Sequence, residues 1–268
     1  MMHGIGARFW RFGCMMCVVL AIAGCSGTNN LTGDRGEGPS SLRLADRAAE
    51  MDDFETAAAL YRRALDSDPE SVDALIGLGR SYRNLGQVNR GEQALREAVA
   101  RAGDNPQVLL ELGRAQLADG RASEAVETLA RGRGEAPRDL RIITAYGIAL
   151  DRLSRHEDAQ QVYQEGLRID PTDFALLGNL ALSRGLSGEP GEGIRILREL
   201  VRDGEADART RGNLALLYGL AGREREARAT LAADLGDHEI DENLAYYREL
   251  RALLAEGRDI GASVAEGV

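Results

Sequence analysis

The side chains that could do chemistry in this chain are three cysteines and three histidines. Cys14 and Cys17 are separated by two residues, a spacing that redox pairs and metal sites use. His156 and His238 lie far apart with no cysteine near either, and we expect both to be solvated in loops between helices. No phosphate loop, nucleophile elbow or paired metal-ligand motif occurs. The sequence therefore favours a non-enzymatic protein with no metal or cofactor.

Residues 1–24 have the organisation of a targeting segment. Two arginines precede an apolar run at 14–24, which is too short to cross a bilayer as a helix because a span needs about 20 residues. The run ends in Ile22-Ala23-Gly24-Cys25, which resembles the bacterial lipobox. That resemblance implies cleavage before Cys25 and acylation of its sulfur and amino group. Cleavage would also remove the CxxC pair, so we do not expect it to act in the mature chain.

The residues after the lipobox bear on where the protein is held. In familiar Gram-negative sorting, an aspartate after the lipidated cysteine retains a lipoprotein in the inner membrane, and a serine lets it move outward. Ser26 holds that position, so we expect an outer-membrane lipoprotein that faces the periplasm. Residues 25–40 are polar and glycine-rich without periodicity, as in a flexible tether.

A layout of two amphipathic helices recurs every 34 residues between 41 and 241. Leu140–Asp173 is the clearest copy, and it lies between prolines that helix interiors disfavour. A small residue recurs at Ala57, Gly91, Ala125, Ala159, Gly193 and Ala227, and a large apolar residue follows at Tyr61, Leu95, Leu129, Tyr163, Leu197 and Leu231. This period resembles the tetratricopeptide repeat. The resemblance implies an all-α fold, a right-handed α-solenoid of about six helix pairs.

The repeat phase slips near the carboxyl end. Asn179 and Asn213 begin matching segments 34 residues apart, but the third copy, at Asn243, follows after only 30. We expect a capping helix at 242–258, with its apolar face formed by Leu244, Tyr247, Leu250, Leu253 and Leu254. Residues 259–268 would be a frayed tail.

Composition limits the classes of partner. The formal net charge is −10, and all 33 basic residues are arginine. Net acidity argues against nucleic acid, because phosphate binding needs a basic face. Only 4% of residues are aromatic although 44% are hydrophobic, so small residues must pack the helices closely. The oligomeric state stays open.

The tetratricopeptide resemblance also implies which positions face a partner, because the first helix of each pair lines the concave groove of such proteins. Counting positions gives a polar wall of Asp73, Arg80, Arg83, Asn84, Arg114, Arg141, Asp151 and Arg152, and a second wall of Asn179, Leu182, Leu186, Asn213, Leu216 and Leu220. The two asparagine amides could pair with an extended peptide backbone, or they could tie neighbouring helices together. The arginines are either solvated charges or a site for acidic peptides.

A narrower likeness lies between Ala208 and Leu254. The segments ARTRGNLALLYGLAGREREARATLAADL and ENLAYYRELRALL resemble the TadD family of lipoproteins, which serve assembly of the tight-adherence (Flp) pilus. The resemblance implies a lipid-anchored scaffold that assists the pilus secretin or other pilus components. Alternatives are a pilotin-like lipoprotein of another type IV pilus and a repeat lipoprotein of cell-wall machinery. An enzyme has no support beyond unassigned carboxylates.

Overall fold

The computed structural model describes residues 40–202, 206–258 and 260, and every regular element in them is a helix. Cys25, the segment before it and the tether as far as residue 39 lie outside the described residues. The helices are α1 (Ser41–Glu50), α2 (Phe54–Ser67), α3 (Val72–Asn84), α4 (Val88–Ala102), α5 (Pro106–Ala118), α6 (Ala122–Glu135), α7 (Leu140–Asp151), α8 (His156–Ile169), α9 (Phe174–Leu186), α10 (Pro190–Arg202), α11 (Ala208–Leu220), α12 (Glu224–Leu231) and α13 (Asp237–Ala255).

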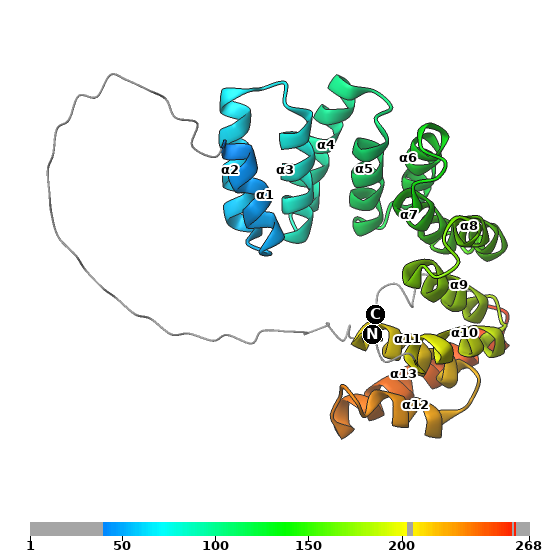
Figure 1. Ribbon diagram of the computed structural model, residues 1–268. Coiled ribbons are helices and arrows are strands. Elements are labelled where there is room, and N and C mark those ends of the chain that lie inside the picture. The colour runs from blue at the N-terminus through cyan, green and yellow to red at the C-terminus, as the bar shows by residue number, and fades with distance from the viewer. Residues whose placement is uncertain (1–39, 203–205, 259, 261–268) are drawn as a thin grey trace, which may run out of the picture. The chain divides into compact units, whose positions relative to one another are not determined.

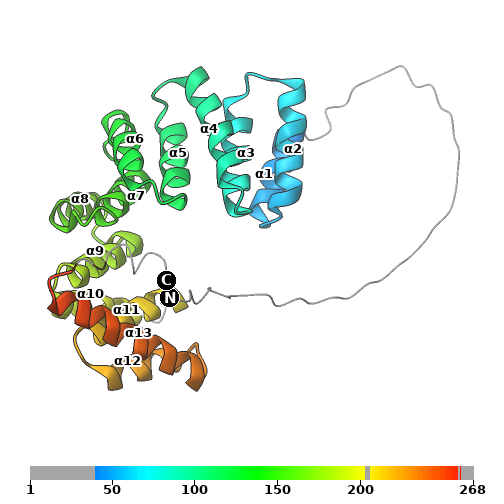
Figure 2. The ribbon, with the colours of Figure 1, turned by 180° about the vertical axis from the view of Figure 1, so that it is seen from behind.

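The helices form six consecutive pairs followed by α13, as the sequence predicts (Figures 1 and 2). Each helix packs on its neighbours in the chain. The first helices of successive pairs, α3, α5, α7, α9 and α11, also contact one another in order, and α13 contacts α11 in the same way. These helices therefore make one layer, and a surface shared by several repeats can form on it.

Two kinds of signal start the helices. The first helices of the pairs begin after a side-chain cap; Ser71, Asp139 and Asp173, for example, accept hydrogen bonds from backbone N–H groups of the first turn. A residue with positive φ precedes each second helix, at Asp52, Gly86, Gly120, Ser154, Gly188 and Gly222. These six residues are 34 apart, so one turn geometry closes every pair.

The repeating small and large residues form the core. Ala57, Ala125, Ala159 and Ala227 have no exposed surface, and neither do Tyr61, Leu95, Leu129, Tyr163 and Leu197. Glycine allows the closest approaches: a Cβ built on Gly193 would lie 2.3 Å from the carbonyl oxygen of Ala181 on the preceding helix. Helix spacing in this core thus depends on the size of single small residues.

The last helix differs from the prediction in its bounds. It begins at Asp237 rather than 242, because Glu239 reaches back and accepts the backbone N–H of Gly236 at 3.0 Å, which caps the added first turn. Leu244, Tyr247 and Leu250 are buried, as expected for its apolar face. No helix within the described ranges is both long and apolar enough to cross a bilayer.

The prediction of a frayed tail over residues 259–268 is wrong at Ile260. It has no exposed surface and belongs to the core cluster formed by α9 to α13. A fully buried isoleucine is held by packing, so the ordered chain extends beyond α13 at this residue. No helical period occurs in the sequence there, which is why the contact was missed. The rest of the predicted tail, residues 261–268, lies outside the described residues.

Candidate protein-interaction surface

The polar wall is organised by a buried carboxylate, Glu111 on α5. Its side chain is 5% exposed and accepts from Nη1 of Arg83 at 2.6 Å and from Nη1 of Arg114 at 3.0 Å. Arg83 lies on α3, so this pairing ties two first helices together. Two guanidinium groups on one carboxylate leave one positive charge and several unused N–H donors on this part of the layer.

Glu111 is a site residue that the sequence analysis missed. It holds the sixth position of its repeat, the position of Asn179 and Asn213, but a helical glutamate with an arginine three residues later is usually a solvated ion pair. Glu111 is buried in the structure rather than solvated. Counting positions within the repeat identifies Glu111 as a groove residue. It was not selected because a glutamate at this position is usually solvated.

Two other predicted residues of this wall, Arg80 and Asn84, form no hydrogen bond with Glu111 among the described contacts. Arg80 is half-buried and lies near the hydroxyl of Tyr61, which donates to Asp46 at 2.7 Å. Burial, then the bond to Asp46, raises the pKa of Tyr61 to about 12, and Arg80 opposes the rise. Asn84 is exposed at the end of α3. Arg83 and Arg114 share hydrogen bonds with Glu111. The hydrogen bond to Asp139 raises the pKa of Arg141, and the charge of Glu111 adds to that rise.

Asp151, at the end of α7, accepts three hydrogen bonds from α8 and α9. Its Oδ1 accepts from Ser183 Oγ at 2.6 Å and lies 2.8 Å from Nδ1 of His156, and its Oδ2 accepts from the Tyr163 hydroxyl at 2.9 Å. Burial, and then the carboxylate, raise the pKa of Tyr163 well above its usual value. We call Asp151, His156, Tyr163 and Ser183 the Asp151 cluster.

The Asp151 cluster contains serine, histidine and aspartate, but not in an arrangement for nucleophilic catalysis. A nucleophilic serine donates to the imidazole, whereas Ser183 donates to the carboxylate itself. The cluster therefore serves to hold three helices together. The expectation that His156 is solvated is wrong, since its side chain is 11% exposed, while His238 is 85% exposed as expected.

The predicted apolar wall lies mostly inside the core. Leu186, Leu216 and Leu220 are 8%, 2% and 6% exposed, so they offer a partner little surface, and their placement on an open wall is corrected. The cause is the close spacing of first helices here: a Cβ on Gly185 would lie 2.1 Å from Leu217, and one on Gly219 would lie 2.5 Å from Tyr247. Such spacing encloses the neighbouring leucines. Leu182 stays half-buried.

Asn179 and Asn213 are both half-buried on the layer formed by the first helices of the pairs, which we call the inner layer. The Nδ2 group of Asn179 donates to the carbonyl oxygen of Ala175 at 2.7 Å, one turn earlier in the same helix. The Oδ1 atom of Asn213 has no accessible surface and no hydrogen-bond donor. Among the described contacts, neither asparagine forms a hydrogen bond to a neighbouring helix. The alternative that these side chains only tie helices together therefore gains no support.

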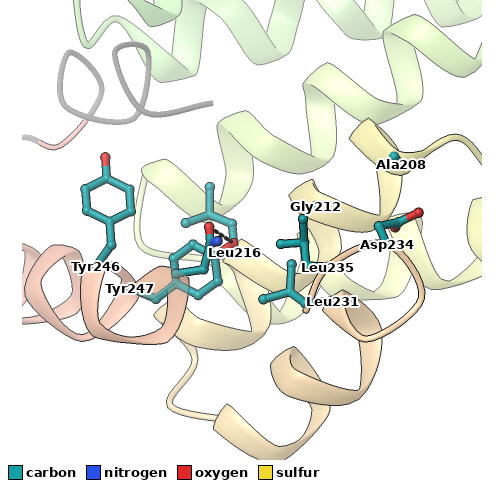
Figure 3. Close-up of a pocket in the computed structure, with 9 residues that line it drawn as sticks. Ala208, Gly212, Leu216, Leu231, Asp234, Leu235, Tyr246 and Tyr247 are labelled. Atoms are coloured by element: carbon teal, nitrogen blue, oxygen red, sulfur yellow. Dashed lines mark hydrogen bonds between the residues drawn. The ribbon is translucent and has the colours of Figure 1, made fainter. Parts of the chain in front are cut away.

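A cavity of about 170 Å³ lies beside this region, between α11, α12 and α13 (Figure 3). Its lining is Ala208, Gly212, Leu216, Leu231, Asp234, Leu235, Asn243, Tyr246 and Tyr247. Asp234 accepts from Nε of Arg211 at 2.7 Å, and that contact lowers the pKa of Asp234. The lining is mostly apolar, with one carboxylate paired to an arginine, one amide and two tyrosine side chains, so it suits an apolar side chain.

Comparison with solved structures shows the same fold elsewhere. PilW, described as a widely conserved type IV pilus biogenesis factor, aligns with a TM-score of 0.65 at 18% identity, over 80% of this chain and 96% of that one. A tetratricopeptide repeat protein from Parabacteroides merdae aligns at 0.63 and 17%, over 84% and 89%. Pseudomonas aeruginosa pilF aligns at 0.62 and 19%, over 77% and 96%.

Sequence comparison gives the family. A search of curated protein sequences found no match. One family of tetratricopeptide repeats matches residues 48–108 and 86–148, and a second matches 142–253. Together the matches run through α2 to α12 and most of α13. The chain is a member of the tetratricopeptide repeat family.

Proposed function

We propose that this protein is a lipid-anchored scaffold on the periplasmic side of the outer membrane, where it helps assemble a tight-adherence pilus or its secretin. The inner layer of first helices would bind a segment of a partner protein. The anchor would confine this surface near an embedded partner and so raise its effective concentration. The role needs no catalysis.

The observation that supports binding most directly is a half-buried asparagine on the inner layer, Asn213, whose amide forms no hydrogen bond to a neighbouring helix among the described contacts. Its Oδ1 is covered in this rotamer, so the amide would have to rotate to donate to and accept from the backbone of an incoming segment. Asn179 lies at the same repeat position one pair earlier, and the arginines held by Glu111 add donors farther along the layer. Repeats of this kind are suited to binding extended segments over several helices.

The assignment to a pilus rests on likeness. The TadD resemblance covers residues 208–254, and PilW shares the fold at low identity. A pilotin-like role in another type IV pilus, or service to cell-wall machinery, would use the same anchor and surface. The identity of the captured protein separates these roles.

The anchor is tested by Cys25→Ser in the full precursor. Without the thiol there is no acylation, so the protein should move from the membrane pellet to the soluble periplasmic fraction after sedimentation. The helical circular dichroism signal should not change, since Cys25 lies before the first helix. Continued sedimentation with membranes would overturn the lipobox assignment.

The binding surface is tested by replacing both Asn179 and Asn213 with alanine. We expect recovery of pilus proteins from an envelope extract to fall at least tenfold, while the melting temperature changes by only about 2 °C. The bait is the mature chain with Cys25→Ser, and quantitative mass spectrometry measures the secretin and the other pilus proteins. A deletion strain that expresses this double variant should also lack surface pili.

Asn89→Ala is the matched control, because Asn89 is an exposed asparagine on the outer helix α4. It should capture partners as the unmodified chain does. Equal capture by all three baits would rule out the asparagine surface. Enrichment of cell-wall enzymes in place of pilus proteins would support the alternative role.

A further inference from the structure

The carboxylate of Glu111 is buried, and both of its oxygens are engaged. Its side chain is 5% exposed, and its oxygens accept from guanidinium groups of two different helices, Oε2 from Arg83 on α3 and Oε1 from Arg114 on α5. A carboxylate can be buried when it is paired and hydrogen-bonded in this way. Glu111 therefore holds the two guanidinium groups beside each other on the inner layer.

The two guanidinium groups keep donors for another acceptor. Each carries five N–H groups in a planar fork, and only Nη1 of each has a partner among the described contacts. The side chain of Arg83 is 17% exposed and that of Arg114 is 36% exposed, so neither is a fully solvated surface charge. Charge-assisted hydrogen bonds to an incoming anion are stronger in such a partly desolvated place than at an open surface.

The charge around Glu111 is positive on a protein that is acidic as a whole. Arg141, on the next first helix α7, feels the charge of Glu111 and pairs through Nε and Nη2 with Asp139, the cap of that helix. These three arginines and two carboxylates leave a net charge of +1, whereas the chain carries −10. An acidic segment is therefore attracted to this place and repelled by most of the remaining surface.

We propose that Arg83 and Arg114, held in place by Glu111, bind a glutamate or aspartate side chain in a segment of the partner protein. The incoming carboxylate accepts from the unused donors of both guanidinium groups, whose planar forks match its two oxygens. Glu111 is a positioning residue, because it contacts the arginines and not the partner. This inference rests on the proposed capture of a protein segment by the inner layer, and it adds that the segment is acidic where it crosses α3 and α5.

Two labelled peptides test the acidic site without any envelope protein. One has four Gly-Glu repeats and the other has four Gly-Gln repeats, and each is titrated with the mature Cys25→Ser chain by fluorescence polarisation at low ionic strength. We expect the glutamate peptide to bind at least tenfold tighter than the glutamine peptide, and added salt should reduce this difference. Arg114→Gln should weaken binding of the glutamate peptide at least fivefold, and the fold should persist because Glu111 keeps its bond to Arg83.

The chain offers a matched control for each variant. Arg195 on α10 pairs with Glu192 three residues earlier, which is the spacing of Arg114 and Glu111, but both control side chains are more than half exposed. Arg195→Gln and Glu192→Gln should each change the affinity by less than about twofold. Glu111→Gln adds a positive charge, so attraction by net charge alone would tighten binding. We expect it to weaken binding at least threefold instead, because the two arginines lose the carboxylate that positions them.

Circular dichroism melting shows whether each variant is folded at the temperature of the titration. The proposal is overturned if both peptides bind equally, if Arg114→Gln has no larger effect than Arg195→Gln, or if Glu111→Gln tightens binding. Displacement of the glutamate peptide by an equal concentration of inorganic phosphate would assign the site to small anions and would also overturn it. None of these results decides the scaffold role, because the asparagine variants test that role separately with envelope extract.

Discussion

Asp151→Ala is expected to lower the free energy of unfolding by about 3 kcal/mol, because it leaves three hydrogen-bond donors without their acceptor. Ser183 has no exposed surface, and Tyr163 has none either, so water cannot replace the carboxylate without opening the core. His156 is 11% exposed and loses its partner at the start of α8. Urea unfolding followed by circular dichroism measures the loss.

Two variants show whether the Asp151 cluster causes this effect. Asp158→Ala removes an aspartate of the next helix that is 47% exposed and pairs with Arg155, so it should cost less than about 0.5 kcal/mol. Asp151→Asn should cost less than Asp151→Ala, since the amide oxygen still accepts from Ser183. If Asp151→Ala is no more destabilising than Asp158→Ala, the cluster does not hold α7, α8 and α9 together.

The fold could be predicted because its determinants repeat. A small residue and a large apolar residue recur at fixed places in every pair, and both are buried in the structure. The start of α13 was misplaced since Glu239 caps Gly236 in a segment where the repeat phase has already slipped. A periodic argument cannot place an element at which the period changes.

The candidate surface could be predicted only in part. Counting positions within the repeat identified the helices that form the inner layer. The burial of each side chain, however, depends on the spacing between neighbouring first helices, which no single repeat specifies. Close packing at Gly185 and Gly219 encloses Leu216 and Leu220, although their positions should face the groove. Glu111 escaped notice for the opposite reason, since a residue type that is usually solvated is buried there between two arginines.

Gly147→Ala is the second variant with a large expected effect. A Cβ at this position would lie 2.2 Å from Cε1 and 2.6 Å from Cζ of Tyr163. The ring has no exposed surface and its hydroxyl is held by Asp151, so it cannot move aside without losing that bond. We expect the free energy of unfolding to fall by about 2 kcal/mol, the usual scale for overpacking a core.

Gly178→Ala, on α9, is the control for this substitution. A Cβ there meets no atom within 4 Å, so alanine should stabilise the helix by about 0.5 to 1 kcal/mol through its lower backbone entropy. Opposite signs for the two glycines, measured by urea unfolding, would assign the loss at Gly147 to the contact with Tyr163. A loss of similar size at Gly178 would contradict that assignment.

Other repeats of this chain show which second substitution should reduce the cost of Gly147→Ala. At the positions of Gly147 and Tyr163, the last two pairs carry Ala181 with Leu197 and Ala215 with Leu231, and all four residues are buried without glycine. Gly147→Ala should therefore cost less when Tyr163→Leu is already present than it does alone, because the last two pairs accommodate alanine beside leucine. Some cost should remain, since a Cβ on Gly79 or Gly113 would lie 2.5 Å from the Cγ atom of the leucine that faces it. The double variant still lacks the hydrogen bond to Asp151, so it should remain less stable than the unmodified chain. An equal cost of Gly147→Ala in both backgrounds would mean that the methyl group meets some other neighbour.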